Sequence, residues 1–396
     1  MDISQKMLGL GKKSSVIREI FEYSKKRKAE IGAENVYDFS IGNPSVPAPA
    51  IVNDTMMRLL SEGDPVLLHG YTAAAGDPAV RQKLADAINR EHHADARWDL
   101  IYMTCGAAAS LTISLAAITE PGNEVLVVAP FFPEYRVFVE HAGAKLVVVP
   151  SRTDNFQLDF DAIEKSINEN TKAMIINSPN NPTGVIIPEE DIKRLAALLS
   201  AKEEEYGHMI YLIADEPYRK LVWNGEAVPY VPNYYADSLV CYSFSKAVSL
   251  PGERIGYIQV SSTMKNAGDV YAAICGAGRA LGFVCAPSLL QFTVAECVDA
   301  TSDFSIYRKN RELLLKELTR IGYDVISPDG AFYLFMKALE PDANAFYEKG
   351  KKHELLLVPS DSFGCPGYVR IAYCVTTEQI ERAIPAFEKL YEDYQK

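Results

Sequence analysis

The sequence predicts an α/β protein in which a large domain with a mostly parallel seven-stranded sheet is followed by a smaller α+β domain. The middle of the chain alternates short β-rich runs with helical stretches, which is typical of strand–helix–strand units with right-handed crossovers. Most of these runs are continuously apolar, as expected of strands buried on both faces of a sheet. The seven runs lie at residues 101–104, 125–129, 145–149, 173–177, 210–214, 239–243 and 255–260.

The other elements follow from hydrophobic spacing along the chain. Residues 16–31 have the spacing of a helix, and the segments 161–167 and 189–204 between strands are also helical in pattern. The pattern changes after about residue 290, where a long helix is expected at 306–321. The small domain then continues with strands at 323–326, 332–336, 356–358 and 369–373, a helix at 344–353 and a terminal helix from Thr377.

The length of 396 residues and the change of pattern predict two domains. We expect a large domain over residues 46–289 and a small C-terminal domain over residues 290–396. Residues 1–45 belong clearly to neither domain. We expect the helix in this N-terminal segment to pack against the small domain or against a second subunit.

Charge and composition exclude several classes of function. The formal net charge is -12 and the sequence pI is about 5.1, so the surface should repel the phosphates of nucleic acids. No apolar run is long enough to span a membrane, and the N-terminus lacks the layout of a signal peptide. Seven cysteines without a C-x-x-C pair favour free thiols in a cytoplasmic protein and argue against a metal site.

Polar residues at the carboxyl ends of the strands are the first candidates for a site, because open parallel sheets bind ligands there. The strand at 239–243 is followed by Lys246, which is placed to attack a carbonyl as a nucleophile. Arg254, with the hydroxyls of Ser243 and Ser245, would make a cradle for a phosphate. Taken alone, Lys246 and Arg254 are better explained as a lysine and an arginine at exposed loop ends, because both residue types are mostly exposed.

Two further strand ends carry groups that suit a flat heterocyclic ligand. Asp215 follows a buried strand, where a carboxylate needs a cationic partner such as a pyridinium N–H. Tyr218 could donate to a phenolate oxygen, and the rigid loop at 178–184 presents the amide of Asn181. Taken alone, D-E-P-Y is weak evidence, because an ordinary turn also explains it. By composition alone, the loop at 178–184 is better explained as a tight turn into the helix at Pro188.

The strand ends at 104 and 129 give weaker signals. The first runs into Gly106, Ala107 and Ala108 at the start of a helix, where backbone N–H groups can reach a phosphate. The second runs into Phe132, which could stack on a cofactor ring, although a phenylalanine in the core is the commoner explanation.

Taken in order and spacing, these motifs resemble the fold-type-I pyridoxal-phosphate (PLP) enzymes, in the class I/II subgroup of aspartate and aromatic aminotransferases. The resemblance rests on N-N-P-T-G at 180–184, D-E-P-Y at 215–218 and S-F-S-K at 243–246, with an arginine eight residues later. It covers nearly the whole chain, from Gly42 to Arg370. It implies PLP as the cofactor and the transfer of an amino group from an L-amino acid to a 2-oxo acid.

The resemblance also implies a role for each residue. Lys246 would form the Schiff base with PLP and move the substrate proton, and Asp215 would pair with the ring nitrogen. Arg370 would bind the substrate carboxylate beside Gly42. The remaining cofactor contacts would come from Asn181 and Tyr218 on the ring oxygen, Phe132 on the ring face, and Ser243, Ser245, Arg254 and the amides of Ala107 and Ala108 on the phosphate.

Tyr71 resembles a tyrosine that reaches the phosphate of the neighbouring subunit, which implies a homodimer with active sites at its interface. The chain departs from the family pattern in two places. The phosphate-binding turn has alanines at 107–109 where serine or threonine is common, so these contacts must come from the backbone. No clear arginine selects dicarboxylic substrates, and Arg279 is the only candidate in the region 278–283.

Two alternatives remain at this stage. A carbon–sulfur β-lyase of the same fold resembles aminotransferases in every motif above, and it would release pyruvate without a keto-acid partner. A PLP-binding effector module of a transcription regulator is the other alternative. Only about 40 residues precede Gly42, too few for a helix-turn-helix domain and a linker, and the acidic charge also argues against DNA.

Overall fold

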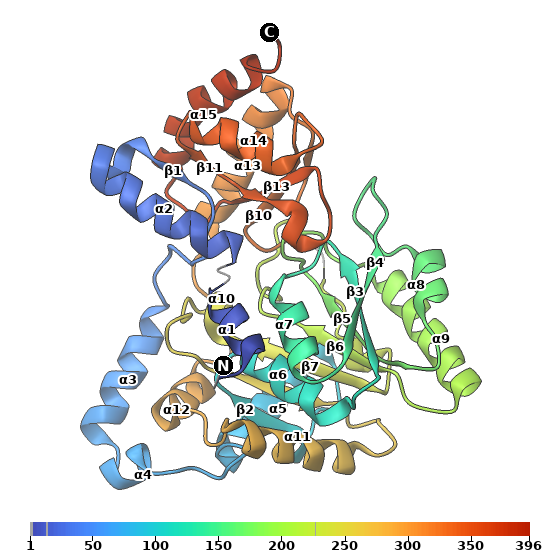
Figure 1. The fold of residues 1–396 in the computed structure, drawn as a ribbon. Helices are drawn as coiled ribbons and strands as arrows, with labels where there is room; N and C mark the ends of the chain where they lie inside the picture. Colours follow the sequence, from blue (N-terminus) through green and yellow to red (C-terminus); the bar gives the residue numbers. More distant parts are fainter. Residues whose placement is uncertain (1–2, 13–14, 226) are drawn as a thin grey trace.

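A computed structural model describes residues 3–12, 15–225 and 227–396 (Figure 1). Its largest element is a seven-stranded sheet in the order β2-β8-β7-β6-β5-β3-β4, in which β8 runs in the opposite direction to the other six strands. The predicted mostly parallel sheet is therefore confirmed, and each predicted run falls on one strand within two residues. The strands are β2 (Ile101–Thr104), β3 (Glu124–Ala129), β4 (Lys145–Pro150), β5 (Thr171–Asn177), β6 (Tyr211–Asp215), β7 (Ser238–Ser243) and β8 (Gly256–Val260).

Helices cover both faces of this sheet (Figure 1). Successive side chains of a strand point to opposite faces. Val125 and Val127 therefore pack in one hydrophobic cluster, and Leu126 packs in another. This arrangement explains why the strands are apolar throughout rather than alternating. One face carries α6 (Ala107–Ile118), α7 (Glu134–His141) and α11 (Ala267–Leu281), and the other carries α5 (Pro78–His92), α8 (Phe160–Ser166), α9 (Glu189–Tyr206) and α12 (Ser288–Glu296).

The C-terminal part forms a second, smaller layer of sheet and helices, at the top of Figure 1. The predicted strand at 356–358 is split in two, because β11 pairs with β1 while β12 pairs with β13. The antiparallel sheet has the order β12-β13-β10-β9. Its strands are β9 (Val325–Ile326), β10 (Tyr333–Lys337), β12 (Val358–Pro359) and β13 (Tyr368–Ala372). The short strands β1 (Tyr37–Asp38) and β11 (Leu355–Leu356) lie beside this sheet. The helices that pack against it are α13 (Ser305–Ile321), α14 (Ala343–Lys351) and α15 (Thr377–Glu392).

The N-terminal helix α2 (Val16–Ile31) packs against this small layer. Ile20 shares a hydrophobic cluster with Val358 and Phe363, and the Arg27 guanidinium lies 2.6 Å from the Glu354 carboxylate. Of the predicted N-terminal segment, residues 1–2 and 13–14 lie outside the described residues. The remaining α-helices that the structure describes are α1 (Gln5–Lys12), α3 (Ala50–Glu62), α4 (Pro65–His69) and α10 (Phe244–Ala247).

The division into residues 1–45, 46–289 and 290–396 stays a proposal, with one adjustment. Helix α12 begins at Ser288, and its Leu290 and Val294 pack in the same cluster as Ile101 and Met103 of the large sheet. We therefore propose that the small domain begins after Cys297, which is the last buried residue of that cluster along this segment.

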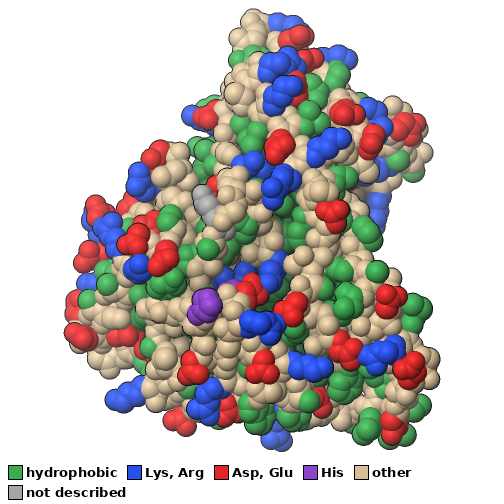
Figure 2. All heavy atoms as spheres, turned by 180° about the vertical axis from the view of Figure 1, so that it is seen from behind, with side chains coloured by type: hydrophobic (Ala, Val, Ile, Leu, Met, Phe, Trp, Pro, Cys, Tyr) green, Lys and Arg blue, Asp and Glu red, His purple; other side chains and the backbone are tan. Residues whose placement is uncertain are grey.

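Charged side chains of both signs are interspersed over the face of the molecule that Figure 2 shows. Within the described ranges, no helix combines the length and the apolar character that a membrane crossing requires.

Candidate active site

The predicted site residues converge on one cavity of about 330 Å³ at the carboxyl end of the large sheet. Strands β5, β6 and β7 and the start of α6 supply its floor, and the small domain supplies residues from β10 and β13. The cavity therefore lies where the two layers meet. Every predicted site residue except Tyr71 lines it, namely Gly42, Ala107, Ala108, Phe132, Asn181, Asp215, Tyr218, Ser243, Ser245, Lys246, Arg254 and Arg370.

Tyr71 lies outside the cavity of its own chain, with 98% of its surface exposed. Its loop is nonetheless held firmly. The buried amide of Gln291 donates to the Thr72 hydroxyl at 3.1 Å, and the backbone N–H of Cys285 donates to the Ala74 carbonyl at 3.0 Å. The loop is thus ordered by the large domain while the tyrosine ring faces solvent.

Lys246 is positioned by the short helix α10, which begins directly after β7. The Ser243 hydroxyl caps this helix by accepting the N–H of Ser245 at 3.1 Å. The Lys246 ammonium donates to the Gly42 carbonyl at 2.7 Å. Burial lowers the pKa of Lys246 to about 8, and the nearby guanidinium group of Arg254 acts in the same direction. An amine with this pKa is available as a nucleophile near neutral pH.

Asp215 ends β6 and is almost fully buried. Its Oδ2 accepts the hydroxyl of the buried Tyr135 at 2.5 Å, whereas its buried Oδ1 has no hydrogen-bond partner among the described residues. Burial raises the pKa of Asp215 to about 7; the Tyr135 hydrogen bond opposes this rise and the neighbouring Glu216 adds to it. A buried acceptor without a partner suits a ring N–H donor, which would restore the charged form.

A chain of hydrogen bonds joins the large sheet to the small domain across the cavity. The Asn177 amide donates to the Asp215 carbonyl at 2.8 Å, and the Asn177 oxygen accepts the backbone N–H of Asn181 at 2.7 Å. The Asn181 oxygen in turn accepts from Arg370 at 3.1 Å, which leaves its amide nitrogen to donate into the cavity. A second Arg370 nitrogen donates to the Ser40 carbonyl.

The Arg370 guanidinium has one N–H group that is available to a ligand. Its side chain is 2% exposed, and its buried Nε has no hydrogen-bond partner in the part of the chain that the structure describes. A carboxylate can accept two parallel hydrogen bonds from a guanidinium, so the unused N–H suits such a ligand.

The opposite end of the cavity offers donors to an anion. The hydroxyls of Ser243 and Ser245 lie 2.6 Å apart, and Arg254 turns into place with a positive φ of 55°. Gly106, with φ 84°, lets the start of α6 approach Arg254, because a Cβ there would lie 2.9 Å from its Nη2. Two hydroxyls, a guanidinium and a helix N-terminus together suit a phosphate.

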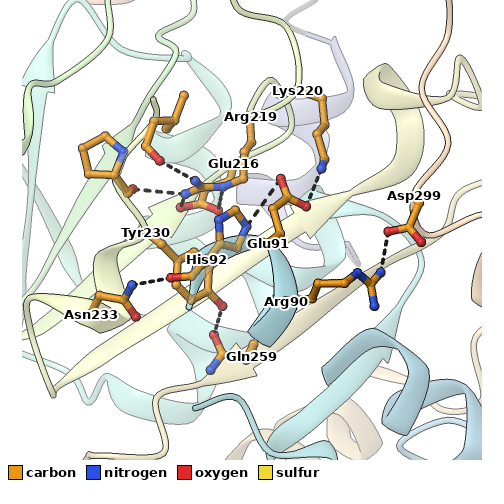
Figure 3. Close-up of polar contacts among 12 residues, drawn as sticks. Arg90, Glu91, His92, Glu216, Arg219, Lys220, Tyr230, Asn233, Gln259 and Asp299 are labelled. Atoms are coloured by element: carbon orange, nitrogen blue, oxygen red, sulfur yellow. Dashed lines mark hydrogen bonds and ion pairs between the residues drawn. The ribbon is translucent and has the colours of Figure 1, made fainter. Parts of the chain in front are cut away.

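A buried ion pair anchors the turn that carries Asp215 and Tyr218 (Figure 3). Between these two residues, Glu216 is not among the residues that line the cavity. Its carboxylate accepts the Arg219 Nε at 2.6 Å. Arg219 also donates to the carbonyl groups of residues 228 and 229 at 2.8 and 3.2 Å. Its guanidinium lies 5.2 Å from the centre of the Tyr230 ring. The ion pair thus holds the turn in place, and the side of the turn that lines the cavity stays free for ligands.

Sequence reasoning missed several lining and supporting residues. Asn177 could have been predicted as a site residue, because it is a polar residue at the carboxyl end of a predicted strand. Tyr135 follows Phe132 by one helical turn, but nothing local indicates that it reaches Asp215. Tyr333 comes from an antiparallel strand of the small domain, and nothing in the sequence around it indicates that it lines the cavity. The apolar walls were also missed and include Ile17, Ile41, Leu111, Phe138 and Pro251.

Residues 34–387 match the family described as aminotransferase class I and II. The chain belongs to this family. It is 30% identical to an aspartate/prephenate aminotransferase of Thermus thermophilus, over 88% of this chain and 89% of that protein. Among solved structures, an amino transferase from Eubacterium rectale is 55% identical with a TM-score of 0.98, over 100% of both chains. An aspartate aminotransferase from Thermotoga maritima is 26% identical with a TM-score of 0.87, over 98% of this chain and 100% of that one.

The protein is a PLP-dependent aminotransferase of fold type I. The class I/II resemblance, the fold, the reaction type and the cofactor expected from the sequence are all confirmed. The carbon–sulfur β-lyase alternative is not favoured, because the similar proteins are named as aminotransferases.

The raised pKa of Asp215 predicts a pH-dependent difference between the cofactor-free protein and its Asp215→Asn variant. Folding raises this pKa from 3.8 to about 7, so the stability that the protonated group contributes is complete below pH 4 and is lost as the pH rises to 7. The variant should gain stability relative to the wild type over that window, by on the order of a few kcal/mol. Urea unfolding of both proteins at pH 5 and pH 8 measures the difference.

The exposed Asp54 on α3 provides the matched control, since Asp54→Asn makes the same chemical change at the surface rather than in the buried site. Parallel pH profiles for the wild type and Asp215→Asn would show that Asp215 is not a buried, unpaired carboxylate.

Proposed function

We propose that this cavity transfers an amino group from an L-amino acid to a 2-oxo acid with Lys246 as the catalytic residue. The observation that carries the proposal is that one wall offers an amine with a lowered pKa, another a buried carboxylate oxygen and a third a guanidinium N–H. Neither the carboxylate oxygen nor this N–H has a hydrogen-bond partner within the described ranges. These groups belong to Lys246, Asp215 and Arg370. They suit an aldehyde, a ring N–H and a substrate carboxylate respectively.

When bound, PLP supplies an aldehyde that condenses with amines and a ring that accepts electrons from the substrate Cα. Asp215 Oδ1 would accept the ring N–H and hold that proton in place. Asn181 and Tyr218 would donate to the ring oxygen, and Phe132 would stack on the ring face. Ser243, Ser245, Arg254 and the amides of Ala107 and Ala108 would bind the phosphate.

Arg370 and the Gly42 backbone would orient the substrate carboxylate, and therefore the Cα–H bond, relative to Lys246. The Lys246 amine, once released from the cofactor, would take the proton from the substrate Cα as a general base. Its pKa of about 8 is close to the working pH, which is the condition for efficient proton transfer in both directions.

Replacement of Lys246 tests this proposal. Lys246→Ala should lower amino transfer by at least about a thousandfold, because general base and covalent attachment are both lost. It should also remove the visible absorbance that a lysine-bound PLP gives. The exposed Lys265→Ala serves as the control and should retain both. A Lys246→Ala protein with wild-type turnover and absorbance would exclude Lys246 as the catalytic residue.

We further propose that the donor amino acid has an uncharged side chain. The cations that line the cavity are Lys246, Arg254 and Arg370, and each already has a role toward the aldehyde, the phosphate or the α-carboxylate. The other walls are largely apolar. A second carboxylate would have to leave water without a cation from the same subunit, which is unfavourable.

The prediction is that phenylalanine is a better donor than aspartate by at least about tenfold in kcat/KM, the ratio given by 1.4 kcal/mol of differential binding. Initial rates with 2-oxoglutarate and each donor measure it. Arg279→Ala is the companion variant, because Arg279 is exposed near the end of α11 and is the one candidate from the sequence for a second carboxylate. Faster turnover of aspartate, abolished in Arg279→Ala, would reverse the assignment.

We propose that the protein is a homodimer in which Tyr71 reaches the phosphate of the neighbouring active site. Beside Tyr71, the α3–α4 segment exposes large apolar side chains, among them Val66 at 79% and Leu67 at 71%. Met57 and Leu60 on α3 are more than half exposed as well. Apolar side chains grouped in this way are typical of a surface covered by another protein.

Leu67→Asp should convert the dimer to a monomer at micromolar concentration, because it places a charge in an apolar contact. Tyr71→Phe should keep the dimer but release PLP more readily, since one phosphate contact is lost. Light scattering and the rate of cofactor loss during dialysis distinguish the two outcomes. A dimeric Leu67→Asp protein would show that this surface is not the interface.

We also propose a cytoplasmic location. All seven cysteines are free thiols, and Cys241, Cys297 and Cys374 are buried where oxidation would disturb the core. Free thiols in this number suit a reducing compartment.

A further inference from the structure

Tyr333 is a buried tyrosine of the small domain that faces the cavity. It begins β10, is 3% exposed and lines the cavity together with Tyr218 and Arg370. It comes from a different layer of the fold than Tyr218, Asp215 or Lys246. Its contacts therefore cross from the small domain to the large one.

The hydroxyl of Tyr333 lies 2.9 Å from the hydroxyl of Tyr218. Burial raises the pKa of both phenols, so both keep their protons at neutral pH. A hydroxyl has one proton to donate. If Tyr218 donates to a ligand in the cavity, Tyr333 must be the donor between the two phenols. A hydroxyl that accepts one hydrogen bond donates the next one more strongly.

The ring of Tyr333 supports the carboxylate-binding end. The Arg370 guanidinium carbon lies 4.6 Å from the centre of the Tyr333 ring, within the range of a cation–π contact. The Tyr333 hydroxyl also packs against Gly42 so closely that any side chain at 42 would collide with it. The carbonyl of Gly42 is the acceptor for Lys246.

We propose that Tyr333 is a positioning residue that sets the donor strength of Tyr218 through its hydroxyl and the place of Arg370 through its ring. The inference rests on the proposed roles of Tyr218 and Arg370. A simpler role is that of a core aromatic, since the ring makes edge contacts with Phe332 and Tyr218. A phenylalanine at position 333 would fulfil that simpler role equally well, so removal of the hydroxyl alone distinguishes the positioning role from the simpler one.

The first test compares Tyr333→Phe with the wild-type holoenzyme. The variant keeps the ring beside Arg370 but leaves Tyr218 without its donor. The visible absorbance of the bound cofactor should titrate at a higher pH, because a weaker donor stabilises the negative ring oxygen less. The charged and titratable groups that face Tyr333 are Tyr218, Arg370 and Cys374, and all three are unchanged in the variant. The kcat should fall about tenfold while the KM for the amino acid stays within twofold.

The second variant, Tyr333→Leu, removes the ring as well. It should show the same shift in titration and, in addition, a rise of about tenfold in KM, since Arg370 loses its aromatic contact. Tyr373→Phe is the matched control: its hydroxyl is also buried in the small domain, where it accepts from Trp223 at 2.9 Å, but it does not line the cavity. It should lower the melting temperature without moving the titration.

Unchanged titration and kcat in Tyr333→Phe would overturn the proposed effect on Tyr218. An unchanged KM in a folded Tyr333→Leu would overturn the effect on Arg370; if that variant does not fold, the first variant still decides the role of the hydroxyl. Failure of the proposed function itself is recognised separately, because the wild type would then lack an absorbance that depends on Lys246.

Discussion

The buried carboxylate at the end of β6 constrains the rest of the site. Taking Asp215 out of water disfavours its charged form, and one hydrogen bond from Tyr135 compensates only in part. In the proposed assignment, a ligand that donates to Oδ1 would recover the charged state on binding. Binding of the cofactor would therefore satisfy an acceptor that has no hydrogen-bond partner among the described residues.

The same constraint explains why the turn after β6 is so firmly held. Asp215 and Tyr218 face the cavity from one short segment, and Glu216 between them is not among the residues that line it. Its ion pair with Arg219 is buried, so either charge alone would be costly there. A pair that is expensive to break keeps the segment in one conformation, and this fixes the directions of the two cavity-facing groups.

Much of the fold was predictable because a parallel sheet buried on both faces leaves a simple pattern of apolar runs. The carboxyl ends of those runs also pointed to Lys246, Asp215, Asn181 and Ser243, since parallel strands deliver their ends to one edge. Arg370 was found only through the family resemblance, because it lies in the middle of an antiparallel strand. Tyr135 and Tyr333 depend on how a helix and the small domain dock, which local sequence does not encode.

The split of the predicted strand at 356–358 has a similar origin. Leu355 and Leu356 pair with β1 near the N-terminus, whereas Val358 pairs with β13, so two neighbouring pairs of residues join different sheets. An apolar run of this length looks like a single strand in the sequence. Its division is decided by a partner more than 300 residues away, Tyr37 and Asp38.

The charges around the cavity also fit together as a set. Lys246, Arg254 and Arg370 are cationic, and Asp215 is the acidic side chain among the lining residues. In the proposed assignment, a phosphate at one end and a carboxylate at the other would place negative charge beside Arg254 and Arg370, and a ring N–H would satisfy Asp215. Arg254 and Arg370 meanwhile contribute to the lowered pKa of Lys246. In the proposed assignment, their charge would attract both anionic ends of the reacting molecules and would keep the central amine available for proton transfer.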